Sequence, residues 1–347
     1  MNSPRSVASG GVLPKVGINI VRYNQELSLL KTSIHAALNQ TFDDVTVTLT
    51  ENGSDHSIEN AILELFGDHP KFRYKDNKTN LGFAGAHNKF FHNSDCEFVI
   101  PLNPDTLVQS EYVGRLLEAF SDPRVAAAEG KMLKPGRHPS GSWILDGTGM
   151  TISRTRKARE RGHLELDANQ YDMNTEVFGV SATAAAYRLS ALEKVKFGES
   201  EYFDEDFFTY WEDLDLSWRL RLAGFSCLYV PHAIIFHSRF AAQSELGFRK
   251  PFDLARHIRS LPARVVCWDW RNHLFAIIKN DFGWNFLRDL PLIATRELLL
   301  FSYLIVVQPK MMAAIPEFIR LLPRVLQKRK IIQKNRVATS KDLSRWF

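Results

Sequence analysis

Six carboxylates and four aromatic side chains share one short stretch of this chain, DEDFFTYWEDLD, at residues 204–215. Apolar residues then recur at helical spacing up to Leu222, which predicts a helix with Glu212 and Asp213 in its first turn. The helix dipole favours acidic side chains there, and this is a purely structural explanation for both. The alternative is chemical, because a carboxylate among aromatic walls is placed to take a proton from a hydroxyl group.

Two further polar clusters follow predicted strands. ENGSD (51–55) comes after the alternating run VTVTLT, and NPDT (103–106) comes after EFVIPL. In an open parallel sheet, ligands bind beyond the carboxyl ends of the strands. Asn103 and Asp105 leave an extended chain on the same side, where two oxygen atoms suit a hard cation such as Mg²⁺ or Mn²⁺. The alternative is an Asn-Pro-Asp turn that only closes the strand.

The remaining candidates are single residues at strand and helix ends. Glu51 is placed to accept hydrogen bonds from a base or a ribose, although the Asn-Gly pair after it is also an ordinary turn signal. Gly82 and Gly85 begin a predicted helix, where they allow either close approach of a phosphate or tight packing of the helix on the sheet. His237 ends the run HAIIFH and is either a structural or surface residue or, beside an ion, a metal ligand.

Alternating strands and helices must position these side chains. Apolar runs at 17–22, 45–50, near 72 and at 97–102 are predicted strands, and helices are predicted at 25–39, 57–66, from Gly82 on and at 110–121. This order predicts an α/β fold with a mostly parallel sheet flanked by helices. From about 125 to 180 the pattern is irregular, and the charged run 153–170 is predicted to be a mobile loop. Strands return at 226–240, and helices follow from about 250 to 335.

Composition sets the broad class. The chain has 347 residues, 45% of them hydrophobic and 24% charged, as in folded globular proteins. Three cysteines without CxxC spacing indicate a reduced compartment with no zinc site. Residues 1–13 lack the apolar run of a signal peptide and are predicted to be a flexible leader. A catalytic domain is expected at 14–245, and a helical, amphipathic and basic region at 246–347.

The order of the motifs resembles one known family. VRYN, ENGSD, NLGFAGAHN, LNPDT, FDEDFFTYWEDLDLSWRLRLAGF, HAIIFH and RNHLFAIIKN follow one another as in the inverting GT-A glycosyltransferases of the large family 2. Its rhamnosyltransferase-like branch is the most similar, and the resemblance covers roughly residues 14–280. It implies a nucleotide-diphospho-sugar transferase (GT-A) fold with a C-terminal helical region. It also implies metal-dependent sugar transfer, with dTDP-rhamnose as the expected donor.

The resemblance implies a role for each candidate. Asp213 matches the catalytic base, and Glu212 is its neighbour. Asp105 matches the principal metal ligand of the DxD element, and His237 matches a histidine that joins the metal shell in some relatives. The residues expected near the donor nucleotide sugar are Tyr23, Asn24, Glu51, Asn52, Gly53, Gly82, Asn88 and Asn103. Glu51 departs from the family, which usually has Asp there, and so does His56, which stands where a second acid is common.

The expected reaction is one displacement that inverts the anomeric configuration. Asp213 takes the proton of the acceptor hydroxyl, and Mg²⁺ or Mn²⁺ is expected to stabilise the leaving diphosphate. Orienting acceptor hydroxyls is a hypothesis for Asp204 and the acids beside it. The alternatives are another hexosyl- or galactofuranosyltransferase of this fold and a non-catalytic sugar-nucleotide-binding protein. A sugar-nucleotide pyrophosphorylase would need a Gly-rich phosphate loop where this chain has RYNQEL.

The C-terminal region indicates a membrane surface. LPLIATRELLLFSYLIVV (290–307) is nearly long enough to span a bilayer, but Arg296 and Glu297 lie inside it. Each such charge costs about 2.5–3.5 kcal/mol at the bilayer centre, so an interfacial helix is the preferred interpretation. The basic segment after it suits an anionic cytoplasmic leaflet, which predicts a cytoplasmic protein, peripheral on the inner face of the cell membrane, with a glycan or polyprenyl-linked acceptor. Packing on the catalytic core, or a homo-oligomer contact, is the alternative, and no nucleic-acid recognition module is present.

Overall fold

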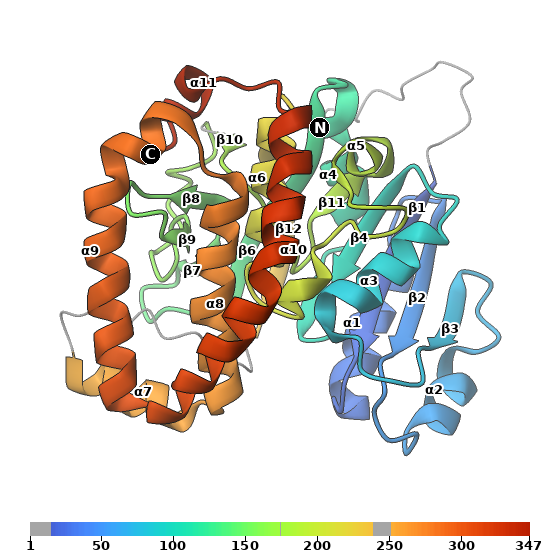
Figure 1. The fold of residues 1–347 in the computed structure, drawn as a ribbon. Coiled ribbons are helices and arrows are strands. Elements are labelled where there is room, and N and C mark those ends of the chain that lie inside the picture. The colour runs from blue at the N-terminus through green and yellow to red at the C-terminus, as the bar shows by residue number, and fades with distance from the viewer. Residues whose placement is uncertain (1–14, 174, 239–250) are drawn as a thin grey trace.

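The computed structural model describes residues 15–173, 175–238 and 251–347 (Figure 1). The predicted leader at 1–13 therefore lies outside the described residues. The predicted alternation of strands and helices is confirmed through the first third of the chain. Its elements are β1 (Val16–Arg22), α1 (Leu27–Leu38), β2 (Val45–Glu51), α2 (Glu59–Phe66), β3 (Phe72–Asp76), α3 (Gly82–His92), β4 (Phe98–Leu102), β5 (Thr106–Val108) and α4 (Tyr112–Glu118).

A mixed region follows. Its strands are β6 (Val125–Arg137), β7 (Trp143–Gly147), β8 (Met150–Ile152), β9 (Ala158–Glu160), β10 (Glu176–Val177), β11 (Ala186–Arg188) and β12 (Ser226–His237), and its helices are α5 (Leu189–Val195) and α6 (Glu212–Leu222). The helix α6 begins at the predicted residue, Glu212, and carries Asp213 in its first turn.

One sheet runs through the molecule and holds the site. In it β3, β2, β1 and β4 are neighbours and parallel, as predicted. Beyond β4 the sheet is mixed, because β11 lies antiparallel between β4 and β6. The next strand, β12, pairs parallel with β6, and β5 pairs antiparallel with β12. The hairpin of β8 and β9 forms a separate small sheet.

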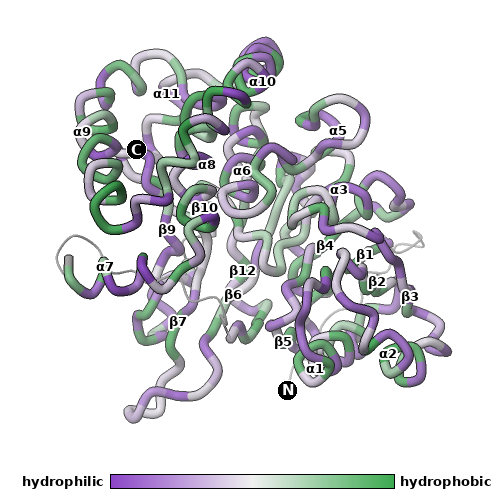
Figure 2. The backbone as a smooth tube through the Cα atoms, turned by 60° about the horizontal axis from the view of Figure 1, so that its bottom comes forward, coloured by the Kyte–Doolittle hydropathy of each residue, from purple (hydrophilic) through white to green (hydrophobic). Residues whose placement is uncertain are grey.

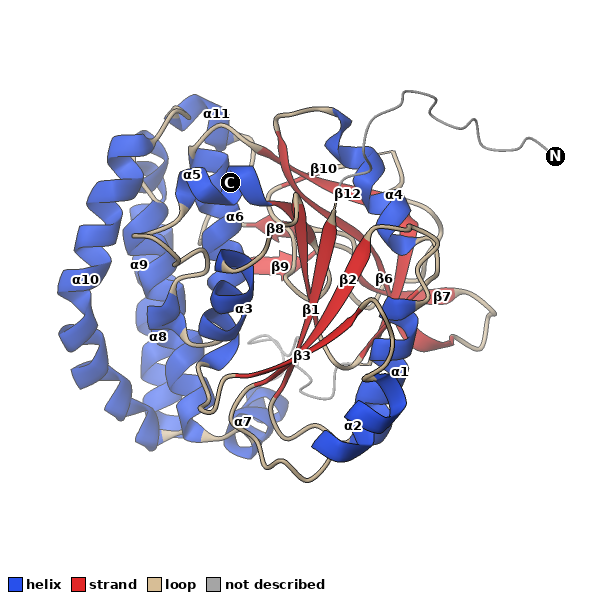
Figure 3. Ribbon diagram, turned by 90° about the vertical axis from the view of Figure 1, so that its right-hand side faces the viewer, coloured by secondary structure: helices blue, strands red, loops and turns tan. Residues whose placement is uncertain are grey.

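Helices cover both faces of the sheet (Figure 3). One core packs Leu30 of α1, Ile62 of α2 and Leu116 of α4 against one face. The other core packs Phe91 of α3 and Leu216 of α6 against the opposite face. Strands buried on both faces are continuously apolar, which explains why the runs in β1 and β4 are recognisable in the sequence.

The prediction of an irregular, partly mobile region between 125 and 180 is wrong in two places. Residues 125–137 form the long strand β6, which begins with small buried residues of low strand propensity, Ala126 to Ala128. The charged run 153–170 is held in place by Arg156, which is fully buried. Its guanidinium lies 2.7 Å from an Asp281 oxygen and 2.9 Å from an Asp289 oxygen.

The chain is helical after residue 250, as predicted. The helices are α7 (Pro251–Ser260), α8 (Ala263–Asn280), α9 (Gly283–Val307), α10 (Ala314–Asn335) and α11 (Ser340–Ser344). Helices α8, α9 and α10 lie together on the side of the sheet covered by α6 (Figures 1 and 3). Lys279 of α8 pairs with Asp204 and, at 2.8 Å, with Asp215 of α6, and all three side chains are fully buried. These ion pairs join the C-terminal helices to the sheet as one folded body.

Candidate active site

A pocket of about 310 Å³ lies beyond the carboxyl end of β4. Five predicted site residues line it together: Asn103, Asp105, Glu212, Asp213 and His237. The rest of its wall comes from the hairpin of β8 and β9, the loop 181–183, residues 209–211, one residue of α8, Phe83 and Leu214. The loop after β4, the start of α6 and the end of β12 are far apart in the sequence, and the sheet brings them to one place.

Asp213 is held at the pocket by backbone groups. Its Oδ1 accepts a hydrogen bond from the Leu214 N–H at 2.7 Å, and its Oδ2 accepts one from the Ala182 N–H at 3.3 Å. Burial raises the pKa of Asp213 above its ordinary value, while these N–H groups oppose the rise. A carboxylate whose pKa is shifted toward neutral is suited to general-base catalysis.

Glu212 lies beside Asp213, but its carboxyl group has different surroundings. Its side chain is buried, and its Oε2 has no hydrogen-bond partner among the described residues. Burial, together with the charge of Asp213, raises the pKa of Glu212 well above its ordinary value. Burial and the neighbouring charge therefore disfavour the ionised form of Glu212 more strongly than that of Asp213.

Asp105 and His237 meet through strand pairing. Thr106 of β5 lies opposite His237 of β12, so the preceding Asp105 lies beside the imidazole. The His237 Nε2 is 3.4 Å from an Asp105 oxygen. A carboxylate and an imidazole nitrogen side by side fit a first-row divalent ion such as Mn²⁺, whereas Mg²⁺ prefers oxygen ligands alone.

Asp146 at the end of β7 is a site residue that sequence reasoning missed. It is fully buried, and its Oδ2 lies 2.9 Å from Nδ1 of His237. A carboxylate behind a histidine fixes the ring and leaves the other nitrogen toward an ion. No spacing signal marks Asp146, because it lies in the stretch whose pattern is irregular in the sequence.

The predicted donor residues before α3 gather at the carboxyl ends of β1 and β2, outside the lining of this pocket. Glu51 is buried, and its Oε2 accepts a hydrogen bond from Arg22 at 2.7 Å. Its Oε1 accepts from the N–H groups of Asn52 and Ser54 at 3.2 and 3.3 Å. The carboxylate of Glu51 is therefore engaged by the protein's own groups.

The neighbours of Glu51 shape the same loop. The Asn52 side chain bonds to Asn80 at 3.1 Å and to Asn77 at 3.2 Å. Gly53 has a φ of +77°, and a Cβ there would lie 2.4 Å from the backbone nitrogen of Asn80. Ahead of the loop, the predicted residues Tyr23 and Asn24 follow β1, and Tyr23 is about half exposed.

Gly82 and Asn88 of α3 face the segment before α6. A Cβ at Gly82 would lie 2.5 Å from the Phe208 carbonyl oxygen, and that oxygen accepts the Phe83 N–H at 2.8 Å. Asn88 is buried, and its side chain bonds to backbone groups of Tyr202 and Phe203. Both residues thus support the acidic stretch rather than line the pocket.

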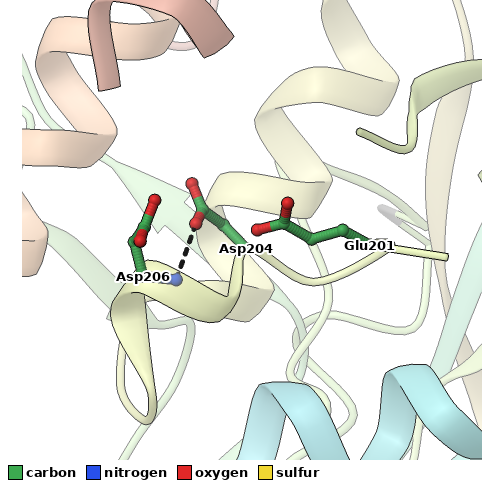
Figure 4. Close-up of side chains that lie close together, drawn as sticks. All are labelled: Glu201, Asp204 and Asp206. Carbon is green, nitrogen blue, oxygen red and sulfur yellow. Dashed lines mark hydrogen bonds between the residues drawn. The ribbon is translucent and has the colours of Figure 1, made fainter. Parts of the chain in front are cut away.

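A second acidic group, Glu201, Asp204 and Asp206, lies apart from the pocket (Figure 4). The Lys328 Nζ lies 2.5 Å from Glu201, 2.5 Å from Asp204 and 2.8 Å from Asp206, where a bound cation would otherwise be. Burial alone would raise the pKa of Asp204, but Lys279 and Lys328 hold it far below its ordinary value. Asp204 has no exposed surface, so the hypothesis that it orients acceptor hydroxyls is wrong.

The fold and the pocket define a GT-A glycosyltransferase. The model of the family "Glycosyl transferase family 2" matches residues 18–196, just over half of the chain. The protein therefore belongs to this family. Asp213, His237 and all of the C-terminal helices lie beyond the matched segment.

Three comparisons illustrate the relationship. The chain is 26% identical over 223 residues to the N-acetylglucosaminyl-diphospho-decaprenol L-rhamnosyltransferase of Mycobacterium tuberculosis, covering 56% of this chain and 67% of that protein. It is 24% identical over 213 residues to the poly-beta-1,6-N-acetyl-D-glucosamine synthase of Staphylococcus epidermidis, covering 61% of this chain but only 47% of that protein. A mannosyltransferase of Pyrobaculum calidifontis, solved with GDP-Man and Mn²⁺, shares the fold at a TM-score of 0.52 and 14% identity, over 93% of this chain and 86% of that one.

Proposed function

We propose that this glycosyltransferase inverts the configuration of a sugar as it moves it from a nucleotide diphosphate to a glycan or lipid-linked acceptor. The observation that carries the proposal is the convergence of two groups in one pocket. One is Asp213, a partly buried carboxylate with a raised pKa. The other is the pair of Asp105 and His237, whose nearest ligand atoms are 3.4 Å apart.

Each residue then has one task. Asp213 takes the proton of the acceptor hydroxyl while the oxygen attacks the anomeric carbon, and the bond from that carbon to the diphosphate oxygen breaks. Attack opposite the leaving group inverts the configuration. Asp105 and His237 would hold a divalent ion, with Mn²⁺ the better match, and Asp146 would orient the imidazole. When bound, such an ion supplies positive charge for the leaving diphosphate.

We propose dTDP-rhamnose as the donor and a polyprenyl-linked glycan as the acceptor. The mycobacterial rhamnosyltransferase, named for L-rhamnose and a diphospho-decaprenol acceptor, supports the sugar and the acceptor. The second candidate donor is a nucleotide-linked N-acetylglucosamine, because the staphylococcal relative is named for that sugar.

The test is release of nucleoside diphosphate by the purified protein. Nucleotide sugars, dTDP-rhamnose and UDP-N-acetylglucosamine among them, are supplied with Mn²⁺ or Mg²⁺ and a bacterial lipid extract. Release with one donor, abolished by EDTA and by Asp213→Asn, supports the proposal and identifies the sugar. Binding of a donor without any release would favour a non-catalytic sugar-nucleotide-binding protein.

We further propose that α9 contacts an anionic lipid surface on the cytoplasmic face of the cell membrane. By length and composition α9 is able to cross a membrane, and 22% of its most apolar window is buried. Figure 2 shows hydrophobic segments along α9, and several of its apolar side chains are exposed. They are Trp284, Leu287, Leu290, Leu292, Leu298, Leu299 and Val306.

Charge supports a lipid surface rather than a buried contact. The two charges within the apolar segment, Arg296 and Glu297, pair with each other, and Glu297 also lies 3.2 Å from His273 of α8. They are therefore turned toward the protein. Exposed cations follow along η3 (Pro309–Ala313) and α10, at Lys310, Arg320, Arg324, Lys330 and Lys334. Basic residues beside an apolar helix attract anionic lipids.

A further inference from the structure

The segment before the catalytic pair has an unusual backbone. Phe208, Tyr210 and Trp211 have φ angles of 66°, 67° and 72°, in the left-handed region that residues other than glycine rarely adopt. Such conformations persist only where the surroundings enforce them, and they gather at functional sites. Glu212 and Asp213 follow at once, so whatever holds this segment also sets where α6 begins.

Helix α8 holds the segment by its backbone. The Asn272 side-chain amide donates to the carbonyl oxygens of Phe207, Thr209 and Tyr210, each at 2.9 Å. Arg271 donates at 2.8 Å to the Asn272 Oδ1, which fixes the orientation of that amide. Both side chains are buried.

The same helix also holds the last aromatic side chain of the segment. The Trp211 Nε1 donates a hydrogen bond to Asp269 Oδ1 at 2.8 Å, and the Trp211 ring packs on His273 with centroids 4.4 Å apart. Asp269 and Trp211 line the pocket together with Asp213. An indole face held beside a carboxylate is a surface on which a sugar ring packs and donates hydrogen bonds.

We propose that Asp269 is a positioning residue that sets, through Trp211, the acceptor-facing wall of the pocket. The ligand of this wall is the acceptor sugar, so the inference rests on the proposed function. Asp269 lies outside the segment matched by the family, and no predicted site residue comes from α8. This wall therefore combines Trp211, from the segment before α6, with Asp269 of the C-terminal helix α8.

The test compares Asp269→Ala, Trp211→Phe and the double variant. Trp211→Phe keeps an aromatic ring but removes the N–H donor, so each single variant deletes the same hydrogen bond. We expect the apparent KM for the lipid extract that supports turnover to rise about tenfold in either single variant, as for the loss of one bond to a charged group. The double variant should be little worse than either one, because the bond can be lost only once.

Two further measurements separate positioning from general stability. Asp269→Asn keeps an oxygen that accepts the indole proton, so we expect it to restore most of the acceptor KM, while the donor KM changes less than twofold in all variants. Asp95→Ala is the matched control, because Asp95 is an exposed carboxylate paired with Lys15 before β4, away from the pocket. Equal increases of donor and acceptor KM, a lowered Tm without a KM split, or no effect of Asp269→Ala would overturn the inference. A wild-type protein that is inactive with every donor would instead contradict the proposed function.

Discussion

Glu212 and Asp213 are adjacent acids whose environments separate their roles. Glu212 is enclosed without a hydrogen-bond partner for Oε2 among the described residues, whereas Asp213 accepts two backbone N–H groups. Those N–H groups favour the charged form of Asp213, whereas burial and the charge of Asp213 favour the neutral form of Glu212. The structure thus distinguishes two residues that the sequence presents as an equivalent pair.

This difference predicts opposite results for two isosteric substitutions. Asp213→Asn removes the base, and we expect the turnover number to fall roughly 10²–10⁴-fold. Glu212→Gln imitates the neutral form that burial favours at this position, so we expect activity within about threefold of wild type near pH 7. Steady-state rates of diphosphate release measure both. Equal losses in the two variants would show that Glu212 shares the base function.

The raised pKa of Asp213 also predicts the acid limb of the activity profile. The base must be deprotonated to act, so activity is lost as the pH falls through its folded-state pKa. Because burial raises that pKa, the limb should lie above the ordinary Asp value of about 3.9. A profile of kcat/KM for the acceptor against pH tests this. A limb at or below that ordinary value would contradict the assignment of Asp213.

Asp146 predicts a residue-scale effect on metal use. Asp146→Asn keeps the size of the side chain but removes the carboxylate 2.9 Å from His237. We expect the Mn²⁺ concentration for half-maximal activity to rise roughly 10–100-fold, with near-wild-type rates at saturating Mn²⁺. Metal titration of the activity measures this, with Asp95→Ala as the control. An unchanged Mn²⁺ requirement would exclude His237 as an ion ligand oriented by Asp146.

At the scale of elements, α10 is fastened to the acidic stretch before α6 through Lys328. Its ammonium group lies within 2.8 Å of Glu201, Asp204 and Asp206, and Asp204 is fully buried. Such a cluster is balanced only while every member is present, because an unpaired buried charge is costly. The acids that resemble a second reactive centre in the sequence therefore form ion pairs that hold α10 against the segment before α6.

Removing the lysine should weaken the fold more than removing a similar surface lysine. We expect Lys328→Met to lower the free energy of unfolding by about 3–5 kcal/mol, since it strands buried carboxylates. Lys330→Met, two residues along the same helix and exposed, is the matched control and should change it by less than about 0.5 kcal/mol. Urea denaturation measures both. Equal stability of the two variants would mean that the cluster is not held by Lys328.

The pH dependence of this stability follows from two pKa shifts. The pKa of Asp204 is lowered in the folded protein, so its contribution is present above about pH 3.9 and is lost as the pH falls toward the folded-state value. The pKa of Lys328 is raised, so its contribution is present below about pH 10.4 and is lost as the pH rises through the folded-state value. The difference between wild type and Lys328→Met should thus be largest between these limits.

At the scale of the whole molecule, the C-terminal helices connect an apolar outer surface to the pocket. Asp289 of α9 pairs with Arg154 and Arg156, which lie between β8 and β9, and that hairpin lines the pocket. Asp269 of the adjacent α8 lines the same pocket. Helix α9 and the wall of the pocket are therefore joined through this hairpin.

Membrane contact through α9 makes a further prediction. We expect Leu298→Ser with Leu299→Ser to weaken binding to vesicles containing anionic phospholipid roughly a hundredfold or more, because each exposed leucine that becomes buried in lipid is worth about 1.5–3 kcal/mol. Leu63→Ser with Leu65→Ser on α2 is the matched control, since these leucines are also exposed but lie on the opposite side of the sheet. Vesicle cosedimentation measures both. Equal binding by the two double variants would refute α9 as the contact.

The sequence alone determined the order of elements through α4 and the start of α6. Hydrophobic periods of 2 and 3.6 residues, and polar residues at strand ends, can be recognised within a few consecutive positions. Such local patterns made Asp105 and Asp213 candidates, and the resemblance to the family implied their roles. The structure places both at one pocket. The strand β6 escaped prediction because its small residues carry no such local signal.

Only the tertiary structure decided which groups meet. Asp146 reaches His237, and Asp269 reaches Trp211, through packing between segments that are distant in the chain. The same packing engages Glu51 with Arg22 and encloses Asp204 with two lysines, so two acids that look reactive in the sequence are neutralised inside the protein. Contact, burial and protonation state depend on neighbours in space, and a chain read residue by residue does not contain them.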